Sequence, residues 1–509
     1  MTHDHDANLL PTPGSADESI ASRRRFLQFG VIAGSTLLLA GCESFREGAP
    51  SGPALDPRAR SRALPRPDDP ASPIGSTASV PTEPVEPPLD LTPPSTEPRV
   101  RVRLARRTLS DPPVEIAAEG SGKQWIRVAR PDTPASAAQA GLVAPGDAGA
   151  VLLVLLSPVR ATFDGASWSL LDGAGQRSRI EGRGAIELGA VKGQTPRIRL
   201  DGDTYPGSIR LVLRGAEAGD PASAVAGIDL VNVVAMEQYL PGVLVRELYA
   251  TWRPSTFTAQ AVAARSFACV ESAYWRTRRH FDVVAGQASQ AYVGTTDHAA
   301  SQRAVKETRG ALLAHSGRMV PGYYSSCCGG VSADARDAIS DSPINDVAPL
   351  RARPPRDCCD WAPQFRWSSA QTGTEAAQRV MAWGRERPNW GVPTLGPLTT
   401  IEAVQMNAYG RPVRFRLADA RGASVELPAE HIRAALNTAT ATLPALRNPL
   451  RSGHFSSPLR SGSFQFAGRG YGHGAGLCQY GAEGMARKGA AWGAIVAEYY
   501  PGAGFARYV

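Results

Sequence analysis

The proline content of residues 43–98 is the feature that most constrains what this chain can fold into. Fourteen of the 42 prolines lie in this segment, mixed with Ser, Thr, Glu and Ala and almost no aromatic residues. Such a composition cannot bury enough apolar surface to offset chain entropy, and proline holds the chain semi-extended. We therefore expect a disordered linker over residues 43–98 and a folded protein that begins near residue 99.

The residues before the linker have the pattern of an export signal. A twin-arginine sequence at residues 22–28 precedes an apolar stretch over residues 29–40, which ends in Leu-Ala-Gly-Cys42. Twelve apolar residues cannot span ~30 Å of hydrocarbon, which needs about 20, so the stretch fits a signal h-region. Small residues before a cysteine are typical of a lipobox, which predicts lipidation of Cys42. An ordinary signal with an incidental Cys42 is the alternative.

These patterns predict a Tat signal peptide over residues 1–42 and an exported lipoprotein, anchored in a membrane and facing the periplasm or cell wall. The rest of the chain has a folded composition. With 509 residues, of which 43% are hydrophobic, two or more folded units are expected. The net charge is +8, but no run of Lys and Arg exceeds three residues. A nucleic-acid partner is therefore not predicted.

Residues 99–228 have the pattern of a β-rich subdomain. Residues 100–104, 197–200 and 209–213 alternate between apolar and polar, and residues 151–156 form a continuous apolar run. Asp-Gly turn signals separate these segments. No catalytic constellation is present among these residues.

Residues 229–509 mix strand and helix patterns. Residues 229–234 predict a strand, and a helix pattern extends from Pro254 to Arg279. The sequence as a whole therefore predicts the α+β class: a β-rich subdomain followed by a mixed α/β core, preceded by the signal peptide and the linker.

Five sequence blocks of this second half match a known family in order. They lie at residues 239–247, 259–265, 289–294, 324–330 and 468–482. In this order the chain resembles the SpoIID/LytB family, and the resemblance covers roughly residues 200–505. The family includes a sporulation lytic transglycosylase that degrades peptidoglycan glycan strands lacking stem peptides, and also proteins described as enhancers of a cell-wall amidase. The resemblance therefore implies a SpoIID-like core over residues 229–509.

The resemblance also implies that Glu247 is the general acid/base of a lytic transglycosylase. The protonated carboxyl donates to the glycosidic oxygen as an oxocarbenium-like state develops. The carboxylate then takes the proton of the muramoyl 6-hydroxyl, which yields a 1,6-anhydro sugar without water or a second carboxylate. The acid must be neutral, which requires burial to raise its pKa. Leu244, Leu248, Tyr249 and Trp252 are available for an apolar wall.

Other acidic residues and other functions are alternatives to this interpretation. On an ideal helix Glu237 and Glu247 lie about 80° apart, and Pro241 between them is expected to interrupt the helix. Asp282 and Asp337 are more distant candidates for a second carboxylate. The alternative functions are a non-catalytic peptidoglycan-binding enhancer of an N-acetylmuramoyl-L-alanine amidase and a glycoside hydrolase that uses water.

A set of polar residues is predicted to contact the glycan. The Arg265 guanidinium suits a muramic lactyl carboxylate, although a helix-surface arginine is the alternative. Alternating glycines over residues 468–476 permit positive φ and close approach by a sugar ring or another backbone. The predicted substrate-binding residues are Gln260, Arg265, Ser289, Gln290, Tyr292, Tyr324, Ser325 and His473.

The cysteines are predicted to form disulfides rather than a metal site. Apart from Cys42 six remain, an even number for an oxidising compartment. Cys327-Cys328 and Cys358-Cys359 are vicinal pairs, and we predict one or two disulfides between them. A zinc site of these four thiolates is the alternative, although the pairs lack the usual two-residue spacer.

Two further predictions complete the inventory of sites and partners. Some SpoIID/LytB members bind zinc through a His and two cysteines after the long helix, but here residues 281–295, which follow His280, contain no cysteine. No metal and no cofactor are therefore predicted, and Cys269 and Cys478 are expected to be buried thiols. The predicted partners are peptidoglycan glycan strands, the membrane through the lipid anchor and, for an enhancer, a cell-wall amidase.

Overall fold

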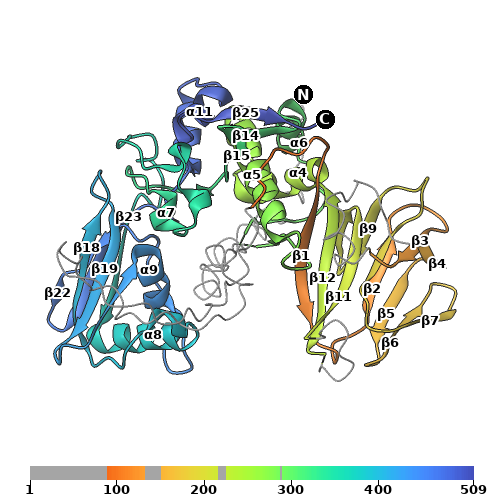
Figure 1. Cartoon of the computed structure of the whole chain (residues 1–509), viewed down its shortest axis with the longest axis horizontal. Coiled ribbons are helices and arrows are strands. Elements are labelled where there is room, and N and C mark those ends of the chain that lie inside the picture. Colours follow the sequence, from red (N-terminus) through yellow and green to blue (C-terminus); the bar gives the residue numbers. More distant parts are fainter. Residues whose placement is uncertain (1–88, 132–150, 216–224, 287–288) are drawn as a thin grey trace, which may run out of the picture.

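A computed structural model describes residues 89–131, 151–215, 225–286 and 289–509 (Figure 1). The predicted signal peptide, Cys42 and residues 43–88 of the predicted linker lie outside the described residues. The described chain mixes helices and several sheets, in agreement with the predicted fold class. Figure 1 shows three parts: a β lobe on the right, a smaller α/β lobe on the left and a helical part that joins them at the top.

The β lobe consists of two sheets that pack on each other. One has seven strands in the order β13-β1-β12-β11-β8-β3-β4, and the other has six in the order β10-β9-β2-β5-β6-β7. Their bounds are β1 (Arg99–Arg107), β2 (Val114–Ala118), β3 (Trp125–Ala129), β4 (Val151–Leu156), β5 (Val159–Phe163), β6 (Ser167–Leu171), β7 (Arg177–Glu181), β8 (Ile186–Ala190), β9 (Arg197–Leu200), β10 (Asp203–Pro206), β11 (Ser208–Arg214), β12 (Gly227–Ala235) and β13 (Val283–Val284).

Alternation of side chains explains this lobe. In β5, Val159, Ala161 and Phe163 are buried while Arg160 and Thr162 are exposed, so one face of the strand meets the core. The fully buried Trp168 of β6 packs beside Phe163, with ring centroids 5.2 Å apart. The two sheets contact each other through β2, β8 and β9. Each sheet thus covers the apolar face of the other.

Strand β12 connects the β lobe to the helical part. It pairs with both β1 and β11 and is buried over almost its whole length. Helix α4 (Met236–Glu247) follows it directly. The predicted boundary between residues 228 and 229 therefore falls inside a central strand, and the sheet extends into the predicted core.

The helical part surrounds helix α5 (Pro254–Trp275). This helix contacts α4, α6, α10, α11 and β14, and it is buried along most of its length. Its alanines let neighbours approach closely: a Cβ on Gly322 would lie 2.1 Å from the carbonyl oxygen of Ala263. The other elements are α6 (Ala299–Glu307), β14 (Ala311–His315), β15 (Arg318–Met319), β16 (Tyr324–Ser325), α7 (Ala335–Ala338), β24 (Leu477–Cys478), α10 (Gln479–Arg487), α11 (Trp492–Tyr499) and β25 (Gly504–Arg507).

Residues 89–98, the last ten of the predicted linker, lie against this helical part. Leu91 is buried, and its carbonyl accepts a hydrogen bond from the amide of Met319. Glu97 pairs with Arg309 at 2.7 Å and accepts the amide of Glu237. Specific contacts with the core hold these ten residues, which composition alone assigned to the linker.

The α/β lobe, residues 366–469, has a hydrophobic core of its own. Phe415 stacks on Phe455 with centroids 4.5 Å apart, and Trp383 and Ile432 complete the packing. The sequence analysis treated residues 229–509 as one core and did not separate this lobe. Its elements are β17 (Arg366–Thr372), α8 (Gly373–Arg385), β18 (Leu398–Met406), β19 (Pro412–Asp419), β20 (Ser424–Pro428), α9 (Ala429–Asn437), β21 (Phe455–Ser456), β22 (Leu459–Arg460) and β23 (Ser463–Arg469).

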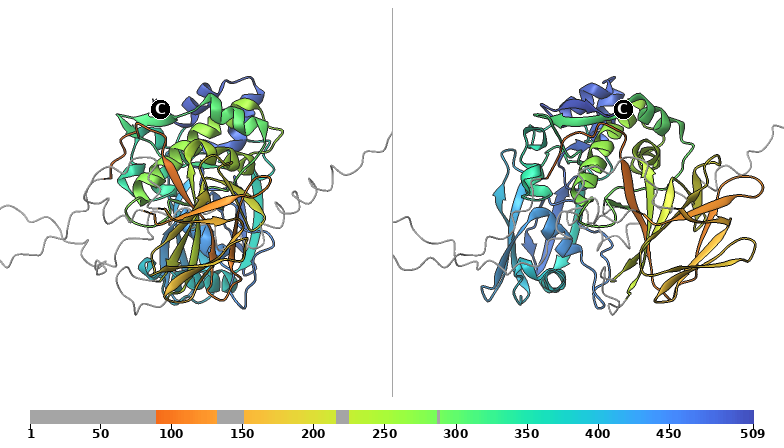
Figure 2. Two further views of the ribbon diagram at one scale, coloured as in Figure 1. Left: turned by 90° about the vertical axis from the view of Figure 1, so that its right-hand side faces the viewer. Right: turned by 45° about the vertical axis from the view of Figure 1, so that its right-hand side comes forward.

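Figure 2 shows the α/β lobe and the β lobe projecting on the same side of the helical part.

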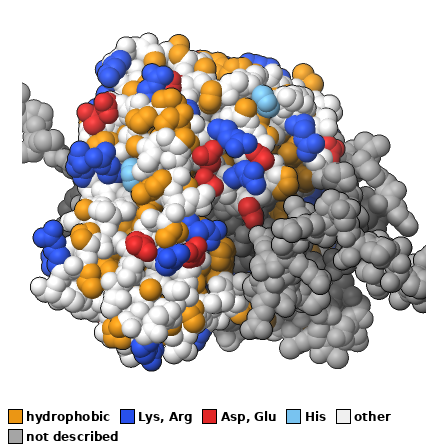
Figure 3. Space-filling model, turned by 60° about the vertical axis from the view of Figure 1, so that its left-hand side comes forward, with side chains coloured by type: hydrophobic (Ala, Val, Ile, Leu, Met, Phe, Trp, Pro, Cys, Tyr) orange, Lys and Arg blue, Asp and Glu red, His pale blue; other side chains and the backbone are white. Residues whose placement is uncertain are grey.

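The face of the molecule drawn in Figure 3 carries mixed charge. Basic and acidic side chains alternate there with apolar ones and form no basic stripe. Among the described helices, none combines the length and the apolar character needed to cross a membrane.

Candidate functional site

Glu247 is the half-buried last residue of α4, and its carboxyl group lies against residues of neighbouring loops. The expected break at Pro241 does not occur, because the buried face formed by Leu240, Val243 and Leu244 outweighs one missing hydrogen bond. The amide of Ala291 donates to Glu247 Oε1 at 2.9 Å. Burial raises the pKa of Glu247, and this outweighs the interactions with Ala291, Gln479 and Tyr324 that lower it.

A chain of hydrogen bonds positions Tyr324 beside Glu247. Tyr239 donates its hydroxyl to Gln290 Oε1 at 3.0 Å, and Gln290 Nε2 donates to the hydroxyl of Tyr324 at 3.1 Å. Gln290 Nε2 also donates to the carbonyl of Ala264 on α5. Burial, and then the charge of Glu247, raise the pKa of Tyr324 well above its usual value. Tyr324 therefore stays a neutral hydrogen-bond donor next to the carboxyl group.

His473 supports Tyr324 from the other side. Its Nδ1 accepts the amide of Ala475 at 3.1 Å, so the proton is on Nε2, which donates to the carbonyl of Tyr324 at 2.9 Å. Burial is the main cause that lowers the pKa of His473 to about 4. The neutral ring thus positions the backbone of Tyr324, and none of its described hydrogen bonds reaches Glu247.

The alternating glycines serve close approach of backbone to backbone. Gly470 and Gly476 have φ of 79° and 67°, which favour glycine. A Cβ on Gly476 would lie 2.0 Å from the carbonyl of Tyr323, and one on Gly470 would lie 2.5 Å from that of Cys327. Of the two predicted roles, contact with another backbone is therefore the one that the structure exhibits. It brings residues 468–482 against the strand that carries Tyr324.

Sequence reasoning missed Gln479 and Tyr480, the first two residues of α10. The side chain of Gln479 interacts with Glu247, and its Nε2 is buried without a hydrogen-bond partner among the described residues. Tyr480 packs against Trp252 and Trp361, with centroids 5.0 and 4.8 Å away. Both residues stand in the block at residues 468–482 that carries the resemblance, so their position in the block was the available signal.

An aromatic wall borders the site, formed by Tyr249, Trp252, Trp361 and Tyr480. Tyr249 follows Glu247 by two residues and lies 5.3 Å from Trp252. Trp252 and Tyr480 are buried, whereas Tyr249 is 53% and Trp361 36% exposed. Exposed aromatic rings next to an acid are a surface on which the apolar face of a sugar can pack.

The other acidic residues are engaged elsewhere. Glu237 forms a bidentate pair with Arg265, with N···O distances of 2.9 and 2.8 Å. Burial alone would raise the pKa of Glu237, but the hydrogen bonds and charge of Arg265 outweigh it and lower the pKa. Asp282 is buried against Arg101, and Asp337 lies half-buried on α7. None of the interactions described for Glu247 involves a second carboxylate.

Several predicted substrate residues are buried in the framework. Arg265 is completely buried in its pair with Glu237, so its guanidinium is not exposed to bind a carboxylate of the substrate. The hydroxyl of Tyr292 donates to Asn232 at 2.9 Å. Ser289 Oγ accepts the amide of Val284.

Ser325 and Gln260 are buried as well. Ser325 Oγ accepts the amide of Gly474 at 3.2 Å, which joins β16 to the glycine block. Gln260 is fully buried on α5, and neither its Oε1 nor its Nε2 has a hydrogen-bond partner in the described part of the chain. The structure thus gathers Glu247, Gln290 and Tyr324 by direct contact. His473 and Ser325 stand behind Tyr324.

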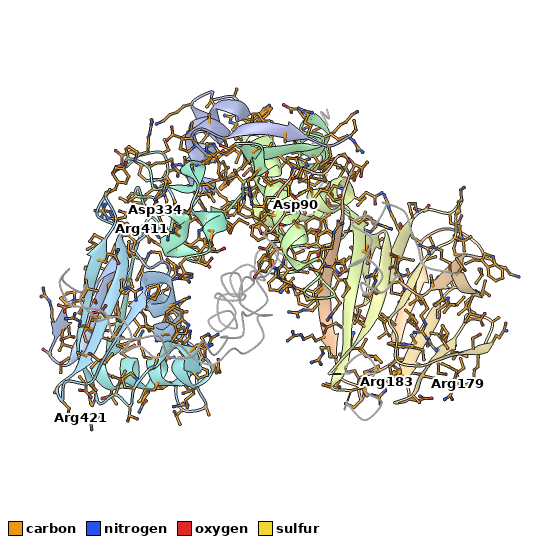
Figure 4. The ribbon with its side chains drawn as sticks, in the orientation of Figure 1. Asp90, Arg179, Arg183, Asp334, Arg411 and Arg421 are labelled. Carbon is orange, nitrogen blue, oxygen red and sulfur yellow. The ribbon has the colours of Figure 1, made fainter. Side chains whose placement is uncertain are left out.

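Arg411 connects the α/β lobe to the same loops. Its guanidinium donates to the carbonyls of Cys328 and Val331, both at 2.9 Å, and to that of His473 at 3.0 Å. Figure 4 shows Arg411 next to Asp334, where the lobe meets α7. The lobe therefore supports the loops that carry Tyr324 and His473.

The predicted disulfide residues are free cysteines in the structure. The Sγ atoms of Cys328 and Cys359 lie 3.8 Å apart, whereas a disulfide bond is ~2.05 Å long. Cys358 is half-buried and is not among the described thiols that gather. His280 bonds Asp229 at 2.9 Å.

The fold is of the α+β class, and the candidate site contains a glutamate at a helix end whose pKa is raised. Residues 225–315, from β12 to β14, match the family model described as SpoIID, Stage II sporulation protein. This range contains Glu247, Arg265 and Gln290. This part of the chain is therefore similar to the SpoIID family, in agreement with the resemblance found in the sequence.

Three curated relatives agree with this assignment. The chain is 22% identical over 300 residues to the Amidase enhancer of Bacillus subtilis (strain 168), a match that covers 53% of this chain and 40% of that protein. It is 25% identical over 287 residues to Stage II sporulation protein D of Bacillus amyloliquefaciens, covering 53% and 74%. An uncharacterised protein of Brachyspira hyodysenteriae is 25% identical over 286 residues, covering 55% and 68%. The chain thus spans less than half the length of the amidase enhancer.

Proposed function

We propose that this protein acts on the bacterial cell wall as a peptidoglycan lytic transglycosylase, with Glu247 as the general acid and base. The observation that carries the proposal is the environment of Glu247. Its carboxyl group has a raised pKa because of burial, it accepts a hydrogen bond from Ala291 and interacts with Gln479 and Tyr324, and none of its described interactions involves a second carboxylate. A reaction that needs a single carboxyl in two successive roles fits this arrangement.

In the first half of the reaction, protonated Glu247 gives its proton to the glycosidic oxygen while the bond from this oxygen to the anomeric carbon breaks. The carboxylate that remains accepts hydrogen bonds from Ala291 and interacts with Gln479 and Tyr324. These donors stabilise the negative charge at the moment when the sugar becomes oxocarbenium-like. The neutral Tyr324 hydroxyl is held in place by Gln290.

In the second half, the muramoyl 6-hydroxyl oxygen bonds to the anomeric carbon and its proton passes to the Glu247 carboxylate. The product is a 1,6-anhydro sugar, and Glu247 is protonated again for the next cycle. The aromatic wall provides a surface for the sugar rings next to the bond that breaks. The same site explains why water and a second carboxylate are not required.

The similarity to the Amidase enhancer favours a second candidate function, in which the protein binds peptidoglycan without cleaving it and stimulates a cell-wall amidase. One experiment distinguishes the two functions. The purified chain from residue 43 onward is incubated with glycan strands lacking stem peptides, and the products are analysed by mass spectrometry. Anhydro-muramoyl ends that disappear in Glu247→Gln but persist in the exposed control Glu181→Gln support the transglycosylase.

Other outcomes of this experiment overturn the proposal. Reducing ends in place of anhydro ends indicate a hydrolase that uses water. Intact strands, together with faster release of stem peptides when an amidase is added, indicate the enhancer.

The cellular location is part of the same proposal. The twin-arginine and lipobox patterns of residues 1–42 favour export and anchoring through Cys42. Radiolabelled palmitate is expected to be incorporated into the natural chain and not into Cys42→Ala. A natural chain without label would refute the lipid anchor and leave the enzymatic proposal standing.

A further inference from the structure

Four buried cysteines gather beneath the candidate site. The Sγ atoms of Cys327, Cys359 and Cys478 all lie within 4.8 Å of one another. The Sγ of Cys328 lies 3.8 Å from that of Cys359. All four residues are at most 9% exposed. They come from three separate segments: the loop after β16, the turn before Trp361 and the end of β24.

We infer that Cys327, Cys328, Cys359 and Cys478 bind one structural zinc ion. Four sulfurs at ~2.3 Å from a tetrahedral zinc lie about 3.8 Å from each other, which is the spacing of Cys328 and Cys359. Disulfides join sulfurs in pairs and do not account for three thiols whose sulfurs all lie within 4.8 Å of one another. Thiolate ligands in this geometry select zinc or iron–sulfur clusters, and a cluster of several irons would hold its sulfurs further apart.

This set differs from the zinc alternative considered from sequence, because Cys478 takes the place of Cys358. A site built from both vicinal pairs would require two pairs of adjacent residues to bind the same ion. In the structure only Cys327 and Cys328 are adjacent, and the other two ligands come from distant segments. The set also differs from the position of the family's His and cysteine site, where His280 bonds Asp229.

Backbone groups around the cluster favour negatively charged sulfur. The amides of Cys328 and Gly481 both donate to Cys478 Sγ at 3.3 Å, and the second caps the first turn of α10. The buried guanidinium of Arg411 donates to the carbonyl of Cys328, and that of Arg353 donates to the carbonyl of Gly476. Donors to the sulfurs and nearby positive charge are the outer-shell contacts that stabilise a thiolate–metal site.

The cluster also has a route to solvent. A hollow lined by Cys328 and Cys359 opens beside Arg353 and Glu498. Metal can therefore reach the ligands in the folded chain. A protein exported folded by the predicted twin-arginine route could also acquire zinc before export, where thiols stay reduced.

The metal would support the candidate site without contacting the substrate. Strands β16 and β24 pair in parallel, with Ser325 opposite Cys478. Tyr324 and Gln479, which interact with Glu247, are the neighbours of these paired residues. Zinc would thus hold both strands together under the carboxyl group. This consequence, unlike the metal binding itself, rests on the proposed function.

Metal content and thiol state of the purified chain test the inference. The chain from residue 43 onward, purified without chelator, is expected to contain one zinc per molecule by plasma mass spectrometry. Cys359→Ser and Cys478→Ser should each lose most of it, while Cys358→Ser and the buried Cys269→Ser should retain it. Cobalt added to the chelated chain should give the visible and near-ultraviolet bands of a tetrahedral thiolate site, a readout that needs no variant to fold.

Three results would overturn the inference. The first is a metal-free chain in which non-reducing peptide analysis finds a disulfide between Cys328 and Cys359. The second is stoichiometric iron with the absorption of an iron–sulfur cluster. The third is equal loss of zinc in Cys269→Ser and Cys478→Ser. A zinc-loaded protein that leaves glycan strands intact would keep the metal site and refute only the transglycosylase.

Discussion

The two ends of helix α4 each carry a partly buried glutamate, and the residues that pack beside the two carboxyl groups differ. At the first end Glu237 meets the Arg265 guanidinium, and this cation lowers its pKa despite burial. At the other end Glu247 meets an amide, a glutamine and a tyrosine but no buried cation, and burial raises its pKa. One helix thus holds a carboxylate whose pKa is lowered by an ion pair and a carboxyl group whose pKa is raised. Burial alone does not decide between the two; the partner does.

The largest expected effect comes from removing the cation at the first end. Arg265→Met leaves the Glu237 carboxylate buried without its partner, which should lower the free energy of unfolding by about 3–5 kcal/mol. Urea unfolding followed by circular dichroism measures this. The double variant Glu237→Gln/Arg265→Met should regain a large part of the loss, because no buried charge remains. A decrease in the free energy of unfolding of less than about 1 kcal/mol in Arg265→Met would contradict a stabilising role of the Glu237–Arg265 ion pair.

At the other end, Tyr324→Phe should affect catalysis and leave the fold intact. It removes a donor that stabilises the Glu247 carboxylate formed during the reaction, so the turnover of glycan strands should fall about 10- to 100-fold. The loss of activity at high pH should also move to higher pH, because the pKa of Glu247 rises further without this hydrogen bond. A pH–rate profile of both proteins checks the shift. An unchanged profile would show that Tyr324 does not act through Glu247.

The two ends should also respond to pH with opposite sign. The lowered pKa of Glu237 contributes stability at neutral pH that is lost as pH falls through the folded-state pKa. The raised pKa of Glu247 contributes stability in acid that is lost as pH rises through its folded-state pKa. At neutral pH Glu237→Gln should therefore be less stable than the natural chain and Glu247→Gln more stable. Both differences should shrink in acid: that of Glu247→Gln as pH falls through the raised pKa of Glu247, and that of Glu237→Gln only at still lower pH, below the usual glutamate pKa of about 4.3. Urea unfolding between about pH 2 and pH 8 measures both.

The smallest effect is expected on the aromatic wall at the Glu247 end. Trp361→Ala removes an exposed ring and should raise KM about 3- to 10-fold with little change in kcat, since stacking is worth about 0.5–1.5 kcal/mol. Trp125→Ala, an equally exposed tryptophan of the β lobe, is the matched control and should change neither constant. A fall in kcat alone for Trp361→Ala would place this ring outside the substrate surface.

The class of fold was predictable from the sequence, and Glu247 could be chosen as the candidate acid, but many contacts could not be predicted. Alternating side chains in segments such as residues 159–163 identify strands without further knowledge, because one face of a sheet must be buried. Glu247 was identified by its place in a block that resembles a family. Arg265 was expected to face a substrate, yet it pairs with Glu237. Its partner lies 28 residues away on another helix, and helical spacing within α5 contains no information about it.

The α/β lobe and the cysteine cluster are two further features that local sequence patterns could not predict. The strands of residues 366–469 alternate like their neighbours, so only the two separate hydrophobic cores distinguish this lobe from the rest. Vicinal cysteines suggested pairing with each other, whereas the structure brings Cys478 to Cys327 and Cys359 through the parallel pair of β16 and β24. Contacts of this kind depend on how distant segments approach each other.

By itself the sequence determined the alternation that builds the sheets and the position of Glu247 within a block that resembles a family, because both are local properties of neighbouring residues. The tertiary structure alone decided that the pKa of Glu237 is lowered, that the pKa of Glu247 is raised, and which thiols lie close together. Those outcomes depend on the charge, donors and solvent access that other segments bring to a side chain, and folding sets all three at once.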